Sequence, residues 1–557
     1  MPVQRHIIST LLLFLLGTIP LSAQQPRPTQ EGMPLEAVER VVMPELDNDA
    51  LREAEAAAQQ PGRPPHFAKA MSVDIRPDTH GNWELLPDGD ALWRLRVQSE
   101  GAYSINLGFS LFYMPTGGRM LLYGPDKSQV LGPFTDADNE NHNQLWTPVL
   151  GGDELVLEVR LPAERRDELQ LWLTAVNHDF LNFYGFATGE CHLDIICGEE
   201  DGWPIIDLYR DIIQSVAVYG LGGETLCTGF LVNNTNQDCK PYFMTAHHCE
   251  VNANNAPSVV AYWNYQNSYC RPPGSVSSGN PGNGSLNNFN TGAVYRAGDS
   301  GKDFVLLELD DPVAPSADAY FAGWTREAIP PSDTMICVHH PDGAEKRISF
   351  AFTESYIGSW SSGSSQVENG DHIIVPQWTF GSTEFGSSGA PLFDHNKRVV
   401  GQLHGGAASC SNSGYDSFGW FRAAWNGPAP NKRLSDWLDP ADTGVFVLDG
   451  HWDISCNISL EVESTDAQIC SPGTAEYQIT VGDAFESPVV LSLDGLPDGI
   501  SYSFSPNPIL PGGVTALQVE VPADDAPAGY LEFDILAQSD NNALSTGASL
   551  LVVNQPP

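Results

Sequence analysis

The chain has few basic residues and almost no long apolar runs. Lys and Arg number 27 against 70 Asp and Glu, which gives a net charge of −43 over 557 residues. A nucleic-acid-binding protein needs a basic surface, and no long basic run occurs, so neither nucleic acid nor an anionic membrane is an expected partner. Beyond residue 25, no segment has the roughly 18 consecutive apolar residues of a transmembrane helix.

Cysteine is missing from the first 190 residues, whereas ten cysteines lie at or beyond Cys191. Their spacing does not form the CxxC pairs of a zinc ribbon. An even number of cysteines predicts disulfides in an oxidising compartment. Eight of them fall between Cys191 and Cys410, and eight cysteines allow on the order of a hundred pairings, so the spacing alone leaves the pairing open.

The first 25 residues predict such a compartment. Arg5 provides a positive charge, residues 7–16 are mostly apolar, and Leu21-Ser22-Ala23 is a small-residue cleavage site. This pattern is typical of a secretory signal peptide. We therefore expect a soluble, extracellular protein without a membrane span, its signal peptide ending at residue 23.

The remaining chain divides into three β-rich segments. Alternating apolar residues at 91–97, 119–123, 155–161 and 169–173 predict strands in a cysteine-free unit, residues 24–188, whose position suggests a propeptide. Short apolar runs and Gly/Ser/Asn turns predict an all-β unit at 189–450, with a short helix at 433–438 that Asn431 caps and Pro440 ends. Residues 451–557 predict an immunoglobulin-like sandwich.

Three stretches of the central segment carry candidate chemistry: Met244–Cys249 (MTAHHC), Gly301–Leu309 (GKDFVLLEL) and Phe385–Pro391 (FGSSGAP). Taken singly, each has a structural interpretation. A histidine beside a cysteine can be structural or a metal ligand, an aspartate before an apolar run is commonly a solvated turn residue, and GSSG is commonly a flexible loop.

Together the three stretches are far more specific. His248, Asp303 and Ser388 follow the chain order His, Asp, Ser of chymotrypsin-type hydrolases. The stretches resemble the histidine, aspartate and nucleophile motifs of that superfamily, and the chain is most similar to bacterial lysyl endopeptidases over residues 189–450. Further similar stretches are Tyr262–Ser268 (YWNYQNS), His339–Pro341 (HHP), Glu345–Ser349 (EKRIS) and Gly401–Gly406 (GQLHGG).

The resemblance implies a chymotrypsin-like double β-barrel and a serine endopeptidase that needs no cofactor or metal. His248 would take the proton of Ser388, and Asp303 would orient the imidazole. The backbone N–H groups of Gly386 and Ser388 would form the oxyanion hole. The partners would be protein or peptide substrates, and we expect a monomer.

One position departs from trypsin. Trypsins have an aspartate directly before the nucleophile, which pairs with the new N-terminal amine after activation, whereas this chain has Ser387 there. Lysyl endopeptidases share this departure, so removal of the propeptide is expected to unblock the cleft instead. The family pattern places the new N-terminus near Gly189, although no lysine closely precedes it.

The expected specificity is for lysine. The position of trypsin's acidic specificity residue is occupied by the uncharged Ser382. The lysyl endopeptidase pattern assigns this role to Asp416, and it makes Trp360, His404 and Gly405 substrate-binding residues. A buried carboxylate would favour a cationic side chain before the scissile bond.

The resemblance also implies disulfides. The family pattern pairs Cys191 with Cys410, Cys197 with Cys270, and Cys227 with Cys249. Elimination leaves Cys239 with Cys337 in the core, and Cys456 with Cys470 in the C-terminal sandwich.

Three alternatives remain open. The enzyme could accept arginine as well as lysine, because one aspartate does not separate the two. The chain could be a catalytically silent secreted binding protein that uses its C-terminal sandwich. A zinc site could lie at His248 and Cys249, or at His339 and His340.

Overall fold

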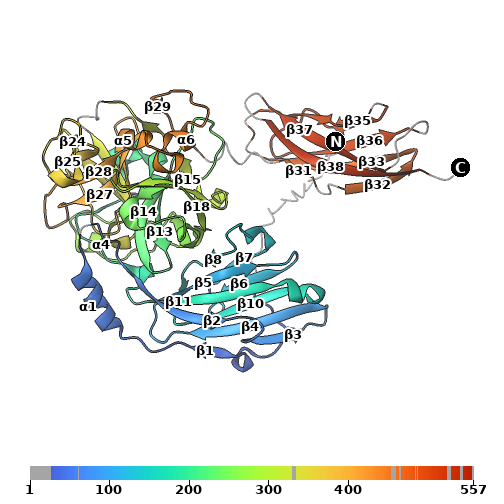
Figure 1. Cartoon of the computed structure of the whole chain (residues 1–557), viewed down its shortest axis with the longest axis horizontal. Coiled ribbons are helices and arrows are strands. Elements are labelled where there is room, and N and C mark those ends of the chain that lie inside the picture. The colour runs from blue at the N-terminus through green and yellow to red at the C-terminus, as the bar shows by residue number, and fades with distance from the viewer. Residues whose placement is uncertain are drawn as a thin grey trace, which may run out of the picture.

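A computed structural model describes residues 27–60, 62–328, 334–452, 460–462, 466–482, 485, 487–497, 499–522, 529–539 and 543–554. The predicted signal peptide and Cys456 lie outside these ranges. The described residues form three β-rich units along the chain (Figure 1), as predicted. None of their helices combines the length and apolar character needed to cross a membrane.

The N-terminal unit is a β-sandwich. One sheet has the order β1-β4-β10-β6-β7, with β3 beside β4, and the other has the order β2-β11-β5-β8, with β9 beside β5. Inward-facing residues such as Trp93, Leu107 and Leu157 form one core between the sheets. The four predicted strands correspond to β4, β6, β10 and β11. The elements are β1 (Arg40–Val42), α1 (Asn48–Ala58), β2 (Ala68–Ile75), β3 (Asn82–Leu85), β4 (Asp90–Gln98), β5 (Ser104–Tyr113), β6 (Arg119–Tyr123), β7 (Val130–Phe134), β8 (Leu145–Trp146), β9 (Leu150–Gly151), β10 (Glu154–Pro162) and β11 (Gln170–Asp179).

The central unit begins with a closed barrel. Its sheet order is β17-β16-β13-β14-β15-β19-β18, and only Gly292 separates the two edge strands along the chain, so the sheet must close on itself. Gly292 has a φ of 79°, and a Cβ there would lie 1.9 Å from Asp310 Oδ2, so this corner requires glycine. The elements are α2 (Pro204–Asp207), α3 (Arg210–Ile213), β13 (Val216–Leu221), β14 (Thr225–Leu231), β15 (Tyr242–Ala246), β16 (Val259–Trp263), α4 (Val276–Gly279), β17 (Asn288–Thr291), β18 (Ala293–Asp299) and β19 (Phe304–Leu309).

A second barrel follows with the same plan. Its sheet order is β12-β23-β22-β26-β27-β28-β25-β24, and β23 continues through residues 352–355 into β24, which closes the sheet. With β17–β18 and β23–β24 each counted as one bent strand, both barrels have the cyclic order 1-2-3-6-5-4. The prediction of a double β-barrel is therefore confirmed. The elements are β12 (Leu193–Asp194), β20 (Tyr320–Phe321), β21 (Trp324–Thr325), β22 (Met335–His339), β23 (Arg347–Ala351), β24 (Tyr356–Gly358), β25 (His372–Val375), β26 (Pro391–Asp394), β27 (Val399–Gly406), β28 (Asp416–Trp420), α5 (Phe421–Trp425), α6 (Ser435–Leu438), β29 (Val447–Leu448) and β30 (His451–Trp452).

The C-terminal end of the central unit differs from the prediction in two details. The helix α6 begins after Leu434, and Asn431 lies in a separate 3₁₀ turn, Pro430–Lys432, so Asn431 is not its cap. Strand β30 pairs with β20, which extends the central unit to Trp452.

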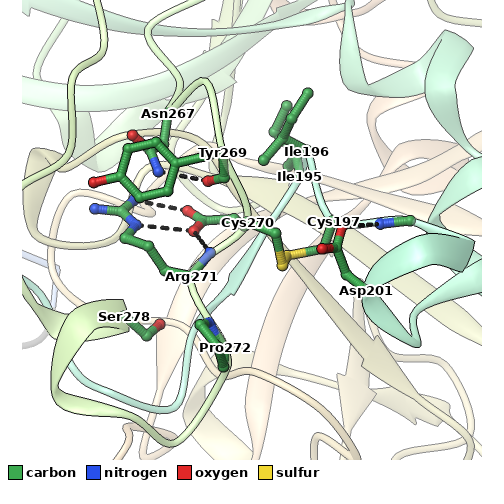
Figure 2. The surroundings of a disulfide bond; sticks show 12 residues. Ile195, Ile196, Cys197, Asp201, Asn267, Tyr269, Cys270, Arg271, Pro272 and Ser278 are labelled. Atoms are coloured by element: carbon green, nitrogen blue, oxygen red, sulfur yellow. Dashed lines mark hydrogen bonds and ion pairs between the residues drawn. A yellow bond between two sulfur atoms is a disulfide. The ribbon is translucent and has the colours of Figure 1, made fainter.

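Buried charges join the two barrels. Figure 2 shows Arg271 beside the disulfide Cys197–Cys270. The Arg271 guanidinium donates to Asp194 at 2.7 and 2.9 Å and to Glu345 at 2.6 Å, and Arg347 lies 2.8 Å from Asp194. Because all four side chains are almost fully buried, removing one charge would leave its partners unpaired. The EKRIS stretch therefore fixes how the barrels meet.

The C-terminal unit is a sandwich of two four-stranded sheets, β31-β33-β36-β35 and β32-β38-β37-β34. Alternating residues of both sheets, including Tyr477, Leu517 and Ile535, form its own core, as the predicted sandwich requires. The strands are β31 (Leu460–Val462), β32 (Asp466–Ser471), β33 (Gly473–Val481), β34 (Val490–Asp494), β35 (Ser501–Ser505), β36 (Val514–Val521), β37 (Gly529–Gln538) and β38 (Ala543–Asn554).

Candidate active site

His248 and Asp303 form a buried pair at the junction of β15 and β19. His248 lies in a 3₁₀ turn directly after β15, and Asp303 directly precedes β19. The atoms His248 Nδ1 and Asp303 Oδ2 are 2.8 Å apart, and the His248 backbone N–H donates to Asp303 Oδ1 at 2.9 Å. Asp303 adopts a φ of 53°, a left-handed conformation that costs a non-glycine residue about 1–2 kcal/mol. The local fold thus sets the imidazole against the carboxylate.

The charge state of Asp303 follows from this pairing. Burial alone would raise the pKa of its carboxyl group, but the charge of His248 and its hydrogen bonds outweigh burial, so the pKa lies below its ordinary value. Asp303 therefore stays ionised in the neutral range, where it can stabilise an imidazolium.

Ser388 is the last residue of loop 382–388 in the second barrel, and it lies against the first barrel. Its carbonyl oxygen accepts a hydrogen bond from the Thr228 N–H of β14 at 2.9 Å, and Cys249 Sγ lies 3.8 Å from the same oxygen. The nucleophile candidate itself therefore contacts Cys249, the neighbour of His248. His248 Nε2 is buried and makes no hydrogen bond to any described residue, so the His248–Ser388 hydrogen bond is not formed in this structure.

The backbone around Ser388 presents two free donors. Gly386 has a φ of 82°, and a Cβ there would lie 2.7 Å from the backbone nitrogen of Gly343, so the turn requires glycine. The Thr228 hydroxyl donates to the Gly386 carbonyl at 2.8 Å. Among the described residues, the N–H groups of Gly386 and Ser388 have no hydrogen-bond acceptor, which leaves them available to an oxyanion.

Three predicted substrate-binding residues gather beside His248. The rings of Trp360 and His404 stack with centroids 3.7 Å apart, and those of His404 and His248 with centroids 5.3 Å apart. Gly405 follows His404, and a Cβ there would lie 3.5 Å from the Trp360 ring. Burial lowers the pKa of His404 to about 4, so its ring is neutral at neutral pH and forms a flat, uncharged wall.

Asp416 is fully buried at the start of β28. The Trp378 indole N–H and the Thr383 hydroxyl donate to its Oδ2 at 2.6 and 2.7 Å. Its Oδ1 faces Gly406, where a Cβ would lie 2.4 Å away. Burial raises the pKa of Asp416 to about 6, although hydrogen bonding from Thr383, Trp378 and the Ala408 backbone lowers it in part. One carboxylate oxygen is thus held by the protein, while the other faces a residue without a side chain.

The structure contains the three disulfides that the family pattern implies, but not the two pairs that were assigned to the remaining cysteines. Cys191–Cys410, Cys197–Cys270 and Cys227–Cys249 are all formed. Cys337 and Cys470 are free, so the predicted pairs Cys239–Cys337 and Cys456–Cys470 are wrong. Cys239 is disulfide-bonded to a cysteine other than Cys337. The elimination failed because it assumed that every cysteine is paired, whereas Cys337 and Cys470 are not.

Each zinc alternative loses one of its two predicted ligands. Cys249 is in a disulfide, so it has no thiolate to offer beside His248. His339 bonds two serine hydroxyls through its two ring nitrogens. In His340, Nδ1 lies 2.9 Å from the Ala344 carbonyl oxygen, whereas Nε2 has no hydrogen-bond partner among the described residues.

Sequence reasoning missed the residues that support the site. Trp378 and Thr383 hold Asp416, Thr228 holds the nucleophile loop, and His372 Nε2 lies 2.9 Å from His404 Nδ1. None of them belongs to a motif, and only the barrel closure brings them to the site. Only Thr228 could have been suspected from the sequence, because it directly follows Cys227, which the family pattern pairs with Cys249 beside His248.

Comparisons with known proteins agree with this picture. Two family descriptions match the chain: "Lysyl endopeptidase N-terminal domain" over residues 42–180 and "Lysyl endopeptidase, C-terminal domain" over residues 186–421. A curated lysyl endopeptidase from Pseudomonas aeruginosa is 27% identical over 386 residues, which cover 65% of this chain and 79% of the relative.

Likeness to solved structures is weaker. The Vibrio cholerae VesB protease matches 61% of this chain and 95% of its own at 13% identity, with a TM-score of 0.26. An endo-beta-1,4-mannanase from Thermotoga petrophila matches 23% of this chain and 25% of its own at 14% identity, with a TM-score of 0.13. Both TM-scores are too low to identify the fold, which is assigned from the strand order of the two barrels.

Proposed function

Because this chain belongs to the lysyl endopeptidase family and is a serine endopeptidase, we propose that it is secreted and hydrolyses peptide bonds after lysine. The observation that carries the lysine preference is Asp416, a buried carboxylate with one oxygen held by Trp378 and Thr383 and the other facing Gly406. A lysine ammonium reaching Oδ1 would find a fixed negative charge in an environment of low dielectric.

The chemistry proposed is acyl transfer from peptide to Ser388. His248 Nε2, which bonds no other described residue, takes the serine proton as the hydroxyl oxygen attacks the scissile carbonyl carbon. The imidazolium is stabilised by Asp303 and returns the proton to the leaving amine. The N–H groups of Gly386 and Ser388 stabilise the oxyanion, and water then hydrolyses the acyl-enzyme by the reverse proton route.

The test is digestion of a denatured protein of known sequence, with mass-spectrometric reading of every new C-terminus. We expect most of them to end in lysine, because only a cationic side chain pairs with Asp416. A comparable share ending in arginine would establish the broader basic specificity instead. A majority of uncharged residues would refute the role of Asp416.

We also propose that the N-terminal unit is a prosegment that blocks the cleft through β14. The backbone groups of the even-numbered residues of β14 point to one edge of the strand. Along this edge, Phe230 pairs with β15. Next to it, the Thr228 N–H donates to the Ser388 carbonyl, and the Leu226 N–H donates to the Pro65 carbonyl at 3.0 Å. The Phe67 N–H donates to the Glu224 carbonyl at 2.8 Å. Residues 65–67 therefore add a short strand directly beside the nucleophile.

The position of this added strand explains latency. Residues two apart along a strand are separated by about 7 Å, so the prosegment backbone lies one pairing step from Ser388. The leaving-group half of a bound peptide would follow the same edge of β14. The prosegment thus takes the place that the substrate needs, and no ion pair at a new N-terminus is required for activation.

Glu55 of α1 holds the blocking segment. Its carboxylate accepts hydrogen bonds from Arg63 at 2.6 and 2.8 Å and from the His66 N–H at 3.0 Å. The Glu55 side chain is only 8% exposed, so loss of Arg63 would leave a nearly buried charge without its partner.

The prosegment, residues 24–188, is expected to inhibit the processed enzyme in trans and competitively with peptide substrates. Its own hydrophobic core allows it to fold alone. Arg63→Ala should weaken the inhibition constant by about tenfold, because the loss costs about 1–3 kcal/mol. Arg165→Ala removes an exposed ion pair with Glu168 and should change it by less than about threefold. Equal effects of the two substitutions, or non-competitive inhibition, would contradict a block at β14.

A further inference from the structure

A buried histidine contacts the loop that carries the nucleophile. His339 ends β22, and no part of it is exposed. Its Nδ1 lies 2.8 Å from Ser387 Oγ, and its Nε2 lies 3.0 Å from Ser349 Oγ in β23. The mechanism proposed above uses none of these three side chains, although Ser387 directly precedes Ser388.

The directions of these hydrogen bonds are determined by what surrounds them. The Ser349 hydroxyl donates to the Ser382 carbonyl at 3.2 Å, so Ser349 Oγ accepts from the Nε2–H of His339. Burial, assisted by the nearby charge of Arg347, lowers the pKa of His339 to about 3. The ring is therefore neutral, and Nδ1 accepts a hydrogen bond from the Ser387 hydroxyl group.

The resulting chain of hydrogen bonds begins and ends on the same loop. The Glu384 N–H donates to Ser387 Oγ at 3.2 Å, Ser387 donates to His339, His339 donates to Ser349, and Ser349 donates to Ser382. Loop 382–388 is thus attached to β22 and β23 at two points five residues apart. Among the buried side-chain atoms that lack a partner in the described residues, none belongs to His339, Ser349 or Ser387.

This series of hydrogen bonds lies where trypsins have a charged aspartate before the nucleophile. A neutral serine and a neutral histidine perform the anchoring here, and they do so in the unprocessed chain. In that chain the N–H groups of Gly386 and Ser388 already lack acceptors among the described residues.

We propose that His339 is a positioning residue for the oxyanion hole. Its bonds to Ser387 and Ser349 hold loop 382–388 so that the Gly386 and Ser388 amides face the substrate carbonyl, both before and after the prosegment is removed. This inference rests on the proposed role of Ser388 as nucleophile. Because an oxyanion forms only during the reaction, loss of this alignment lowers kcat and leaves KM nearly unchanged.

Two amide substitutions separate positioning from packing. His339→Asn keeps an acceptor near the position of Nδ1 and so retains the bond to Ser387, whereas His339→Gln keeps a donor near Nε2 and retains only the bond to Ser349. We expect kcat of the Asn variant within about tenfold of wild type and kcat of the Gln variant lower by about 10²–10³-fold. KM for a lysyl peptide should change less than about threefold in both.

Thermal stability provides the control. Asparagine is smaller than glutamine and leaves the larger cavity, so Tm should be lower for His339→Asn. Of the two variants, His339→Asn is therefore expected to have the higher kcat but the lower Tm. If kcat follows Tm, if both variants lose kcat equally, or if KM rises instead of kcat falling, His339 is structural and the proposal is overturned.

Failure of the proposed function is visible separately in the same preparations. Wild-type enzyme should hydrolyse the lysyl peptide, and a peptide phosphonate should label Ser388. If the wild-type enzyme is active but the phosphonate labels a different residue, Ser388 is not the nucleophile. If the wild-type enzyme is active and labelled at Ser388 but the two His339 variants have equal kcat, only the role of His339 is refuted.

Discussion

Replacing Ser388 by alanine is expected to lower kcat of the processed enzyme by about 10⁵–10⁶-fold, with KM for lysyl peptides changed by less than about threefold. The substitution removes the atom that forms the acyl-enzyme. It leaves Asp416, the His404–Trp360 stack and the free N–H groups of the oxyanion hole in place, so binding persists while chemistry fails. The measurement is hydrolysis of a chromogenic lysyl peptide at high enzyme concentration.

Ser316→Ala is the matched control for this substitution. Ser316 is an exposed serine of the first barrel whose hydroxyl bonds only Asn288 among the described residues, and its loss should leave kcat unchanged. Retention of more than about 1% activity by Ser388→Ala, in a preparation that a phosphonate does not label, would place the nucleophile elsewhere. A wild-type chain that neither hydrolyses the lysyl peptide nor reacts with the phosphonate would instead favour the interpretation of the chain as a secreted binding protein.

Asp416→Asn should lower kcat/KM for lysyl substrates by about 10²–10⁴-fold, since removal of one partner from a buried charge pair costs about 3–5 kcal/mol. The asparagine has the same shape and can still accept from Trp378 and Thr383. Substrates with norleucine before the scissile bond should be cleaved as well as before, or better. Asp394→Asn alters another buried aspartate of the same barrel, one that caps a turn, and should leave the ratio of lysyl to norleucyl activity unchanged.

The pH dependence of that ratio provides a second measurement on Asp416. Its pKa of about 6 means that the carboxyl is neutral below this pH and charged above it. Lysyl kcat/KM should therefore fall, relative to norleucyl kcat/KM, as the pH decreases through about 6. His248 affects both substrates equally and cancels in the ratio. Asp416→Asn should abolish this dependence, and a ratio that is independent of pH in wild type would exclude Asp416 as the lysine partner.

How much of this site the sequence could predict depends on whether a residue belongs to a motif. His248 and Asp303 lie in contiguous stretches with recognisable flanks, and their 2.8 Å contact follows from two neighbouring strands, β15 and β19. The two barrels were predictable because apolar alternation and resemblance pointed the same way. Asp416 could be assigned only from the family pattern, because nothing in its own flanks indicates burial.

Other residues could not be predicted because their roles depend on contacts between distant segments. His339, Ser349 and Ser387 form one chain of hydrogen bonds only because β22, β23 and the nucleophile loop meet in the second barrel. In the sequence, His339 was a candidate zinc ligand. Cys337 and Cys470 show the same limitation: counting cysteines suggested partners for both, whereas both are free.

The edge of β14 has a consequence for the mature enzyme's behaviour at high concentration. If the N-terminal unit is removed as proposed above, Glu224 and Leu226 would expose backbone groups that are paired here, and an unpaired strand edge can pair with a second molecule. Here the exposed stretch is only three residues long, it follows the turn Gly222–Gly223, and it carries the charge of Glu224. A strand edge this short and charged can pair with one extended peptide but gives little support to pairing between two copies of the enzyme. The enzyme would therefore keep this edge open for its substrate without aggregating through it.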